Sequence, residues 1–193
     1  MEPKDVFTFL LSLAGLIIAG VGLATWKKQL RGVKEFDAAF DLNFSILKLR
    51  EAIKYVRKIV IWPSEHNEAY KYSETKYPNL SESDRQKNLN AYVYELRWQK
   101  ISGAVTDLDS HLLAAEVLWG KDIVKIVKKL EAKVTELNIG LEQYFKPELR
   151  TREYVALHEL IFDRGEKDDD FRREIEKIIE EIKDYMKQKI YGY

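Results

Sequence analysis

The sequence contains no cysteine, and this absence bears on the compartment of the protein. A chain without cysteine agrees with a reducing environment, in which disulfides do not persist. An excess of charge of one sign is also lacking, because 32 Lys and Arg residues balance 32 Asp and Glu residues. No global charge therefore favours nucleic acid or an acidic substrate as a partner. The sequence also lacks a cofactor-binding loop, a metal-ligand cluster and a nucleophile constellation, so we expect no cofactor and no metal.

What the sequence does have is an apolar stretch near its start, Val6 to Trp26, without a charged side chain. A helix over this stretch is about 30 Å long, which matches the hydrocarbon core of a bilayer. A cleavable signal peptide has a basic start, a shorter apolar stretch and a cleavage site made of small residues. Because this stretch is longer and acidic residues accompany Lys4, we expect a transmembrane anchor at residues 1–27 and a cytoplasmic domain at residues 28–193.

Basic residues flank the apolar stretch unevenly, and this asymmetry predicts its orientation. Lys4 precedes the stretch, whereas four basic residues follow it closely: Lys27, Lys28, Arg31 and Lys34. Because positive flanks stay in the cytoplasm, we expect a single-pass protein of the bacterial inner membrane, with its N-terminus outside. Trp26, Lys27, Lys28 and Arg31 are then the residues at the membrane interface.

Small residues recur within the stretch at steps of three and four, which places them on one helical face: Ser12, Gly15, Ala19 and Gly22. Small residues let two membrane helices approach closely, and they are typical of helix association. The pattern predicts self-association into a homo-oligomer. Glycine and alanine are also common in transmembrane helices generally, so a monomeric anchor remains the alternative.

Apolar residues beyond the anchor follow a helical period. One run predicts a long helix that ends where Trp62 meets Pro63: Ala39, Leu42, Ile46, Leu49, Ile53, Val56 and Val60. We expect an interruption between anchor and helix only at Gly32. A second apolar face, formed by Phe36, Phe40, Phe44 and Leu47, predicts that this helix lies deep in the assembly.

The remainder reads as further helices. Residues 64–79 are rich in polar residues and predict a long connection. Ser81, followed by Asp84, predicts the start of a second long helix that ends near Gly120. A third helix has apolar residues at heptad spacing from Ile123 to Tyr144, a short helix covers residues 148–163, and a last helix covers residues 167–190. The predicted fold class is therefore all-α, an N-terminal transmembrane helix followed by a cytoplasmic bundle of about four long helices.

The first cytoplasmic helix resembles a recurrent stretch of uncharacterised small single-pass bacterial membrane proteins with a cytoplasmic helical bundle. The resemblance is carried by Lys48-Leu49-Arg50-Glu51-Ala52-Ile53 with Val56-Arg57, and more faintly by Glu116-Val117-Leu118-Trp119-Gly120. Such proteins often continue with an arginine-asparagine-proline turn, where this chain has Arg57-Lys58-Ile59. The resemblance implies a bacterial inner-membrane protein and carries over no catalytic residue.

One spacing is similar to the signature of HEPN ribonucleases, an arginine and a histidine separated by five residues in an all-α bundle. Arg152 and His158 have this spacing. The arginine would neutralise phosphate charge and the histidine would transfer a proton. The alternative interpretation is a surface arginine and a histidine that packs against its neighbours. The acidic run at residues 168–170 fits the start of a helix, and His111 has Asp107 and Asp109 nearby without a defined ligand geometry.

Two classes of function follow from these patterns. The favoured one is a membrane-anchored helical interaction or scaffold protein, self-associating and part of a bacterial signalling or defence system. Its partners are the lipid bilayer, further copies of the chain and a protein of unknown identity, and nucleic acid is not expected. The alternative is a membrane-tethered HEPN-like ribonuclease that uses Arg152 and His158.

Overall fold

The computed structural model is an all-α structure, with seven helices and no strand in the residues that it describes. It describes the backbone of residues 3–146, 151–165 and 169–192, and their side chains except at residues 3, 5, 6, 8–12, 151 and 152. The helices are α1 (Pro3–Val56), α2 (Pro63–Lys76), α3 (Glu82–Lys87), α4 (Leu89–Trp119), α5 (Lys121–Tyr144), α6 (Thr151–Ile161) and α7 (Asp170–Tyr191). The predicted all-α fold class is confirmed.

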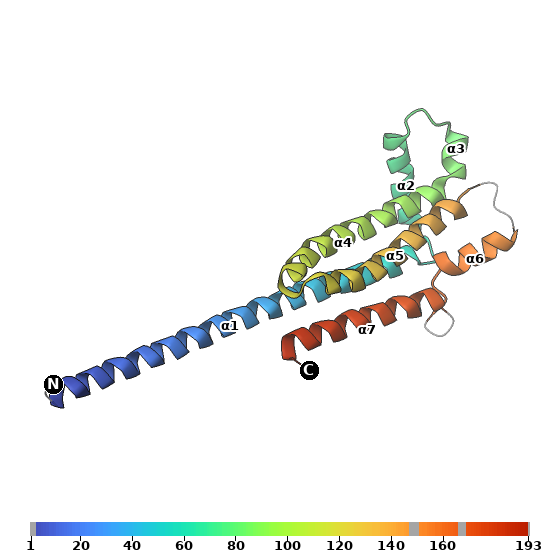
Figure 1. The fold of residues 1–193 in the computed structure, drawn as a ribbon. Helices are drawn as coiled ribbons and strands as arrows, with labels where there is room; N and C mark the ends of the chain where they lie inside the picture. Colours follow the sequence, from blue (N-terminus) through green and yellow to red (C-terminus); the bar gives the residue numbers. More distant parts are fainter. Residues whose placement is uncertain (1–2, 147–150, 166–168, 193) are drawn as a thin grey trace.

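The second half of α1 forms a four-helix bundle with α4, α5 and α7 (Figure 1). α1 packs on α4 and α7, whereas α5 packs on α4, α6 and α7, so α1 and α5 lie on opposite corners. All four long helices contribute fully buried side chains to one core: Leu42, Ile46, Leu49, Leu108, Leu130, Leu137, Ile179 and Ile182. Burying each of these side chains contributes roughly 1.5–3 kcal/mol relative to leaving it exposed.

The heptad helix is confirmed as α5. Tyr144, the last residue of the predicted run, is half-buried, and the six inward residues before it are buried: Ile123, Val127, Leu130, Val134, Leu137 and Leu141. Gly140 lies on the same helix, where a Cβ atom would come within 2.6 Å of Leu160 in α6. The short helix therefore packs closely against α5 at this point.

α1 differs from the prediction at two places. It continues without a break through Gly32, and it ends at Val56 instead of Trp62. The early end has a physical cause, because the carbonyl oxygens of Lys58 and Val60 accept hydrogen bonds from Arg97 at 2.6 and 2.7 Å. A side chain of α4 thus satisfies groups that the next turn of α1 would have used.

The prediction of a long connection over residues 64–79 is wrong, because most of this segment is α2. Pro63 occupies the first turn, and the backbone N–H of Trp62 donates to the Glu65 carboxylate at 2.9 Å. Proline at the first helical position and glutamate at the third are signals for the start of a helix. The polar composition of the segment favours a connection instead, and the prediction followed it. Burial of Ala69 and Ser73 against α4 then compensates for the low helix propensity of the segment.

The predicted start at Ser81 is confirmed, since its hydroxyl oxygen accepts a hydrogen bond from the Asp84 N–H at 3.1 Å. The helix that it caps is only the short α3, and a break at Asn88 separates α3 from α4. The expected helices over residues 148–163 and 167–190 correspond to α6 and α7. Residues 148–150, 167 and 168 lie outside the described part of the chain.

The second apolar face of α1 is not buried, which corrects the prediction that this helix lies deep in the assembly. Phe36, Phe40 and Phe44 are 53, 64 and 60% exposed. α4 and α7 lie on either side of α1, and Phe36 and Phe40 border a hollow of about 270 Å³ beside the last turns of α7, but no element of the described chain covers the outward face itself. Leu47, the fourth residue of the set, is half-buried.

The first half of α1 projects from the bundle as a single helix (Figure 1). Among its described side chains the first buried one is Ala38. In the part of the chain that the structure describes, no helix combines the length and the apolar character needed to cross a membrane. The predicted anchor includes Val6 and residues 8–12, whose side chains lie outside the described residues.

Candidate functional site

The residues predicted for helix association lie on the projecting half of α1. Gly15, Ala19 and Gly22 are exposed, and the side chain of Ser12 lies outside the described residues. A Cβ atom added at Gly15 or Gly22 would meet nothing within 4 Å. Nothing described within the chain therefore requires glycine at these positions, and their small size leaves the backbone open to a helix from outside.

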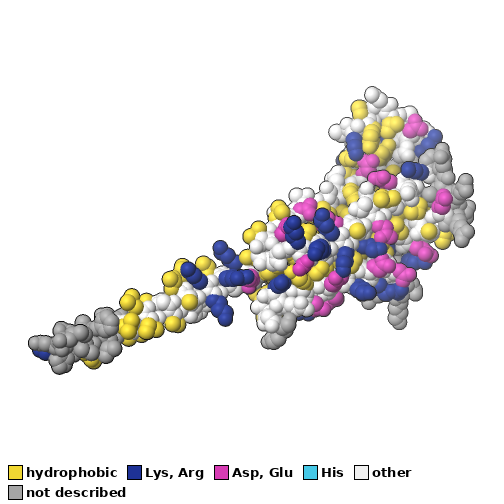
Figure 2. Space-filling model, viewed as in Figure 1, with side chains coloured by type: hydrophobic (Ala, Val, Ile, Leu, Met, Phe, Trp, Pro, Cys, Tyr) yellow, Lys and Arg dark blue, Asp and Glu magenta, His cyan; other side chains and the backbone are white. Residues whose placement is uncertain are grey.

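The residues predicted for the membrane interface follow directly along α1. Trp26 is 59% exposed, and Lys27 and Lys28 are exposed as well. Arg31 forms an ion pair with Glu35 one turn later, with Nε and Oε1 at 2.9 Å. Figure 2 shows apolar side chains along the projecting helix and Lys and Arg side chains gathered where it approaches the bundle. An apolar stretch is thus followed on one exposed helix by a group of basic residues that we name the basic collar: Lys27, Lys28, Arg31 and Lys34.

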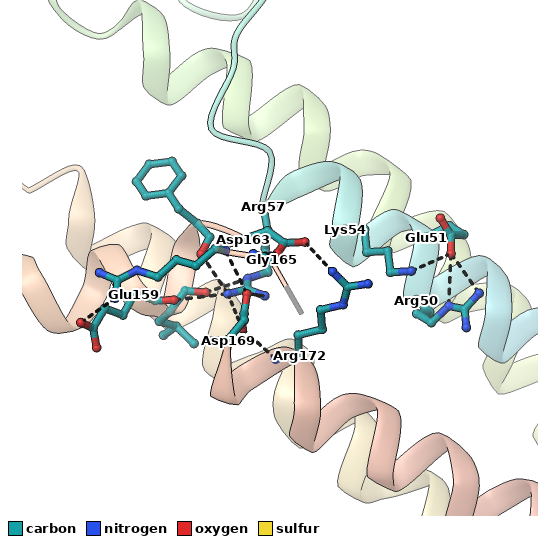
Figure 3. Close-up of polar contacts among 12 residues, drawn as sticks. Arg50, Glu51, Lys54, Arg57, Glu159, Asp163, Gly165, Asp169 and Arg172 are labelled. Carbon is teal, nitrogen blue, oxygen red and sulfur yellow. Dashed lines mark hydrogen bonds and ion pairs between the residues drawn. The ribbon is translucent and has the colours of Figure 1, made fainter. Parts of the chain in front are cut away.

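A buried arginine at the end of α1 ties the two C-terminal helices to it (Figure 3). Arg57 is 2% exposed, and its guanidinium forms an ion pair with Asp169 at 2.8 Å. It also donates to three carbonyl oxygens of α6 and the turn after it, those of Glu159, Leu160 and Phe162. Its own carbonyl oxygen accepts from the Asp163 N–H at 3.0 Å. We name this cluster the Arg57 clamp.

Asp169 also serves as the N-cap of α7. Its carboxylate accepts hydrogen bonds from the N–H groups of Arg172 at 2.9 Å and Arg164 at 3.3 Å. Burial opposes ionisation of this carboxyl, but the hydrogen bonds from Arg57 and from these N–H groups outweigh it and lower its pKa. The acidic run at residues 168–170 therefore contributes a helix cap and an ion-pair partner, while Asp168 itself lies outside the described residues.

A second buried arginine holds α2 against the bundle. Arg97 is 2% exposed and forms two hydrogen bonds with Glu65, at 2.8 and 3.0 Å. The hydrogen bonds from Arg97 lower the pKa of Glu65 to about 2, against the opposing effect of burial. A hollow of about 390 Å³ lies beside this pair, with Tyr55, Glu68 and Lys100 in its lining. All polar atoms of the Arg97 guanidinium face partners within the chain, so the pair has the bonding of a structural link.

An open groove of about 500 Å³ lies between α2, α4 and α5. Its lining combines aromatic rings with polar side chains, among them Tyr72, Trp98, Phe145, Lys76 and Asn138. Lys76 is already occupied, since it donates to the Tyr72 hydroxyl and pairs with Glu95. We see no convergent set of catalytic groups among these lining residues.

His158 lies on α6 among aromatic rings. Its ring centroid is 4.4 Å from that of Phe162, and the rings of Tyr144 and Tyr154 lie within 6.5 Å. Such neighbours are typical of a packing residue. The side chain of Arg152 lies outside the described residues, so the ribonuclease hypothesis stays a prediction.

A serine and histidine pair between α1 and α4 escaped the sequence reasoning. Ser45 Oγ and His111 Nδ1 are 2.5 Å apart, while the same hydroxyl donates to the Asp41 carbonyl oxygen at 2.9 Å. Because its proton is engaged there, Ser45 accepts from His111 and is not activated as a nucleophile.

Asp107 pairs with Lys48 at 2.5 Å. The described residues contain no group of three or more His, Cys, Asp or Glu side chains arranged for a metal.

Arg57 and Arg97 were missed as well, although a signal for Arg97 exists. It lies four residues after Val93 and four before Ile101, and both are buried on the inward face of α4. An arginine in an inward position predicts a buried ion pair. Its partner, Glu65, belongs to a segment that the composition assigned to a loop.

Comparison with known protein families, with curated proteins and with solved structures finds no match to this chain. The resemblance carried by Lys48 to Arg57 therefore stays a prediction. Function has to be argued from the chain alone.

Proposed function

We propose that this protein is a membrane-anchored helical scaffold that works by binding other proteins, with residues 1–27 as the anchor and residues 28–193 as a cytoplasmic interaction domain. The observation that carries the proposal is α1, an unbroken helix of 54 residues whose first half stands outside the bundle. An isolated apolar helix in water exposes surface that soluble proteins normally cover. A bilayer provides that cover.

The distribution of charge along α1 supports this proposal. Exposed Trp26 and the basic residues after it suit the boundary between lipid and water, where aromatic rings and positive side chains are enriched. The basic collar lies on the bundle side of the apolar stretch, so the bundle is cytoplasmic and the N-terminus outside. The inner membrane of a bacterium, and a signalling or defence system within it, fit this arrangement.

The scaffold role is favoured over catalysis because the buried arginines and the Ser45–His111 pair are satisfied within the fold. Arg57, Arg97 and Ser45 bond to groups of their own fold. The small residues on α1, in contrast, face outward. We propose that the anchor associates with further copies through Gly15, Ala19 and Gly22.

Topology is the first test of the proposal. A reporter fused after Tyr193 should be active on the cytoplasmic side, and the protein should stay in the membrane after alkaline extraction. Replacing Lys27, Lys28, Arg31 and Lys34 by glutamine should lower the fraction in this orientation by several fold, because these residues set the charge asymmetry. Release by alkaline extraction, or reporter activity outside the cell, would contradict the proposal.

Association of the anchor is tested separately by crosslinking in membranes. Gly15→Ile and Gly22→Ile should reduce association at equal expression, because bulk at these positions separates the helices. Leu13→Ile, on the other side of α1, is the matched control and should leave association unchanged. Equal association of all three variants would mean that the small residues reflect composition alone.

A further inference from the structure

The outward face of α1 does not end with the apolar stretch but continues into the bundle. Exposed apolar residues follow each other at steps of three and four along it: Leu23, Trp26, Leu30, Val33, Phe36, Phe40 and Phe44. All are between 45 and 64% exposed. Contiguous apolar surface of this kind marks an interaction site. We name it the α1 stripe.

The α1 stripe shares its side of the helix with the small residues. At about 100° per residue, Gly15, Gly22, Val33, Phe40 and Phe44 fall within a sector of about 40°. Because α1 has no break at Gly32, this relation is fixed along the whole helix. Along this face of α1, the side chains are therefore small near the N-terminus of the helix and aromatic beside the bundle.

Few charged residues lie on this face. Lys28 and Arg31 lie about 150° from the centre of the stripe, on the side of α1 that further along becomes buried, and Lys27 and Lys34 lie about 90–110° from it. Asp37 lies within about 30° of the stripe centre, and Asp41 lies at the edge of the stripe, about 70° from its centre, as Leu23 does. A second α1 laid along the stripe would thus meet mainly apolar side chains, with Lys28 and Arg31 turned away from it.

From these observations we infer that the α1 stripe is the contact with a second copy of this chain, packed in parallel as a two-stranded coiled coil that runs from the anchor into the bundle. The inference extends the proposed self-association beyond the anchor and names its partner surface. Parallel pairing sets each residue beside its own copy, small beside small and aromatic beside aromatic. Alternating steps of three and four, which such packing needs, connect Leu23, Trp26, Leu30 and Val33, and the same register continues through Asp37 to Phe40 and Phe44.

The occupant must also match the stripe in length. From Gly15 to Phe44 the stripe extends over about 44 Å of helix, which a second α1 covers in full register. Lipid cannot cover the aromatic part, since Phe44 lies about 27 Å along the helix from Trp26 at the proposed interface. A parallel copy meets both requirements at once.

The absence of cysteine makes a direct test possible in the full chain. Single cysteines are introduced at Val33 and Phe40 in the stripe, and at Lys28 and Arg31, about 150° around the helix from the stripe centre, as matched controls. After mild oxidation in native membranes, Val33→Cys and Phe40→Cys should give at least about fivefold more disulfide dimer than Lys28→Cys and Arg31→Cys, since only stripe positions face their own copy. Equal yields at all four positions, or dimer at one stripe position only, would overturn the parallel pairing.

A second variant tests Asp37, the charged residue nearest the stripe centre. Parallel pairing brings Asp37 beside its own copy, and two like charges repel each other. Asp37→Leu in the F40C background should therefore raise the dimer yield by several fold. An unchanged or lower yield would place Asp37 away from its copy and overturn the register.

The outcomes separate this inference from the proposed function. If alkaline extraction releases the chain but stripe-specific dimers form, the parallel pairing is supported and the membrane anchor is contradicted. If the chain stays in the membrane but no stripe-specific dimers form, the anchor is supported and the pairing is contradicted. Phe40→Glu with Phe44→Glu should abolish the dimers while circular dichroism shows an unchanged melting temperature, because both side chains are exposed.

Discussion

At the scale of single residues, two buried arginines connect parts of the chain that the core alone does not hold. The Arg57 clamp joins the end of α1 to α6 and α7, and Arg97 joins α4 to α2. Each guanidinium bonds both to a carboxylate and to backbone carbonyl oxygens. A buried ion pair adds little net stability over a well-packed apolar pair, but removing one partner leaves a buried charge.

Arg57→Met should therefore destabilise the bundle by about 3–5 kcal/mol, because Asp169 and three carbonyl oxygens lose their partner. Denaturant unfolding followed by circular dichroism measures the loss. Lys125→Met is the control, since Lys125 pairs with Asp122 on the surface, and it should leave the unfolding midpoint unchanged. An Arg57→Met midpoint equal to that of the control would mean that the clamp is dispensable.

Acid should weaken the same links. The pKa of Glu65 is lowered to about 2, and the pKa of Asp169 is lowered as well, whereas in the unfolded chain both carboxyls titrate near 4. A lowered folded-state pKa gives stability that is present above the unfolded pKa and lost as pH falls towards the folded one. The free energy of unfolding should thus fall between about pH 5 and pH 2. The Glu65→Gln variant should be less stable at pH 7, and its free energy of unfolding should fall less steeply with decreasing pH than that of the parent chain. An equally steep fall would mean that ionisation of Glu65 does not cause the acid sensitivity.

At the scale of elements, apolar periodicity predicted which helices pack in the core. It did not predict helix ends that depend on polar contacts. α5 follows its heptad because the inward positions from Ile123 to Leu141 are aliphatic. The end of α1 at Val56 could not be predicted, because it depends on Arg97, which is 41 positions further along the chain. Phe36, Phe40 and Phe44 of the α1 stripe were assigned to the core, since periodicity shows that a face is apolar but not what covers it.

The core assignment of α5 can be tested with two neighbouring positions. Leu137 is fully buried, so Leu137→Asp places an unpaired charge in the core and should cost more than about 4 kcal/mol, enough to unfold the domain. Ile139 is 47% exposed on the same helix, and Ile139→Asp should leave the thermal transition nearly unchanged. A cooperative, unshifted melting transition of Leu137→Asp would remove α5 from the core.

At the scale of the whole molecule, the unbroken α1 fixes the rotation of the bundle relative to the first half of the helix. Inserting two residues after Gln29 should turn the bundle by about 200° relative to the first half of α1, whereas seven residues return it almost to its original orientation. Disulfide dimers through F40C should be lost with the first insertion and retained with the second. Equal yields from both would show that α1 bends freely between its halves.

The same unbroken helix also sets a distance. From Trp26 to Ala38, the first buried side chain, α1 rises by about 18 Å, and charges in physiological salt are screened over about 8 Å. In the proposed arrangement the charged surface of the bundle therefore stands beyond the electrostatic reach of anionic headgroups. In that arrangement lipid charge would act on the basic collar, and the bundle would select protein partners by its own surface whatever the composition of the membrane beneath it.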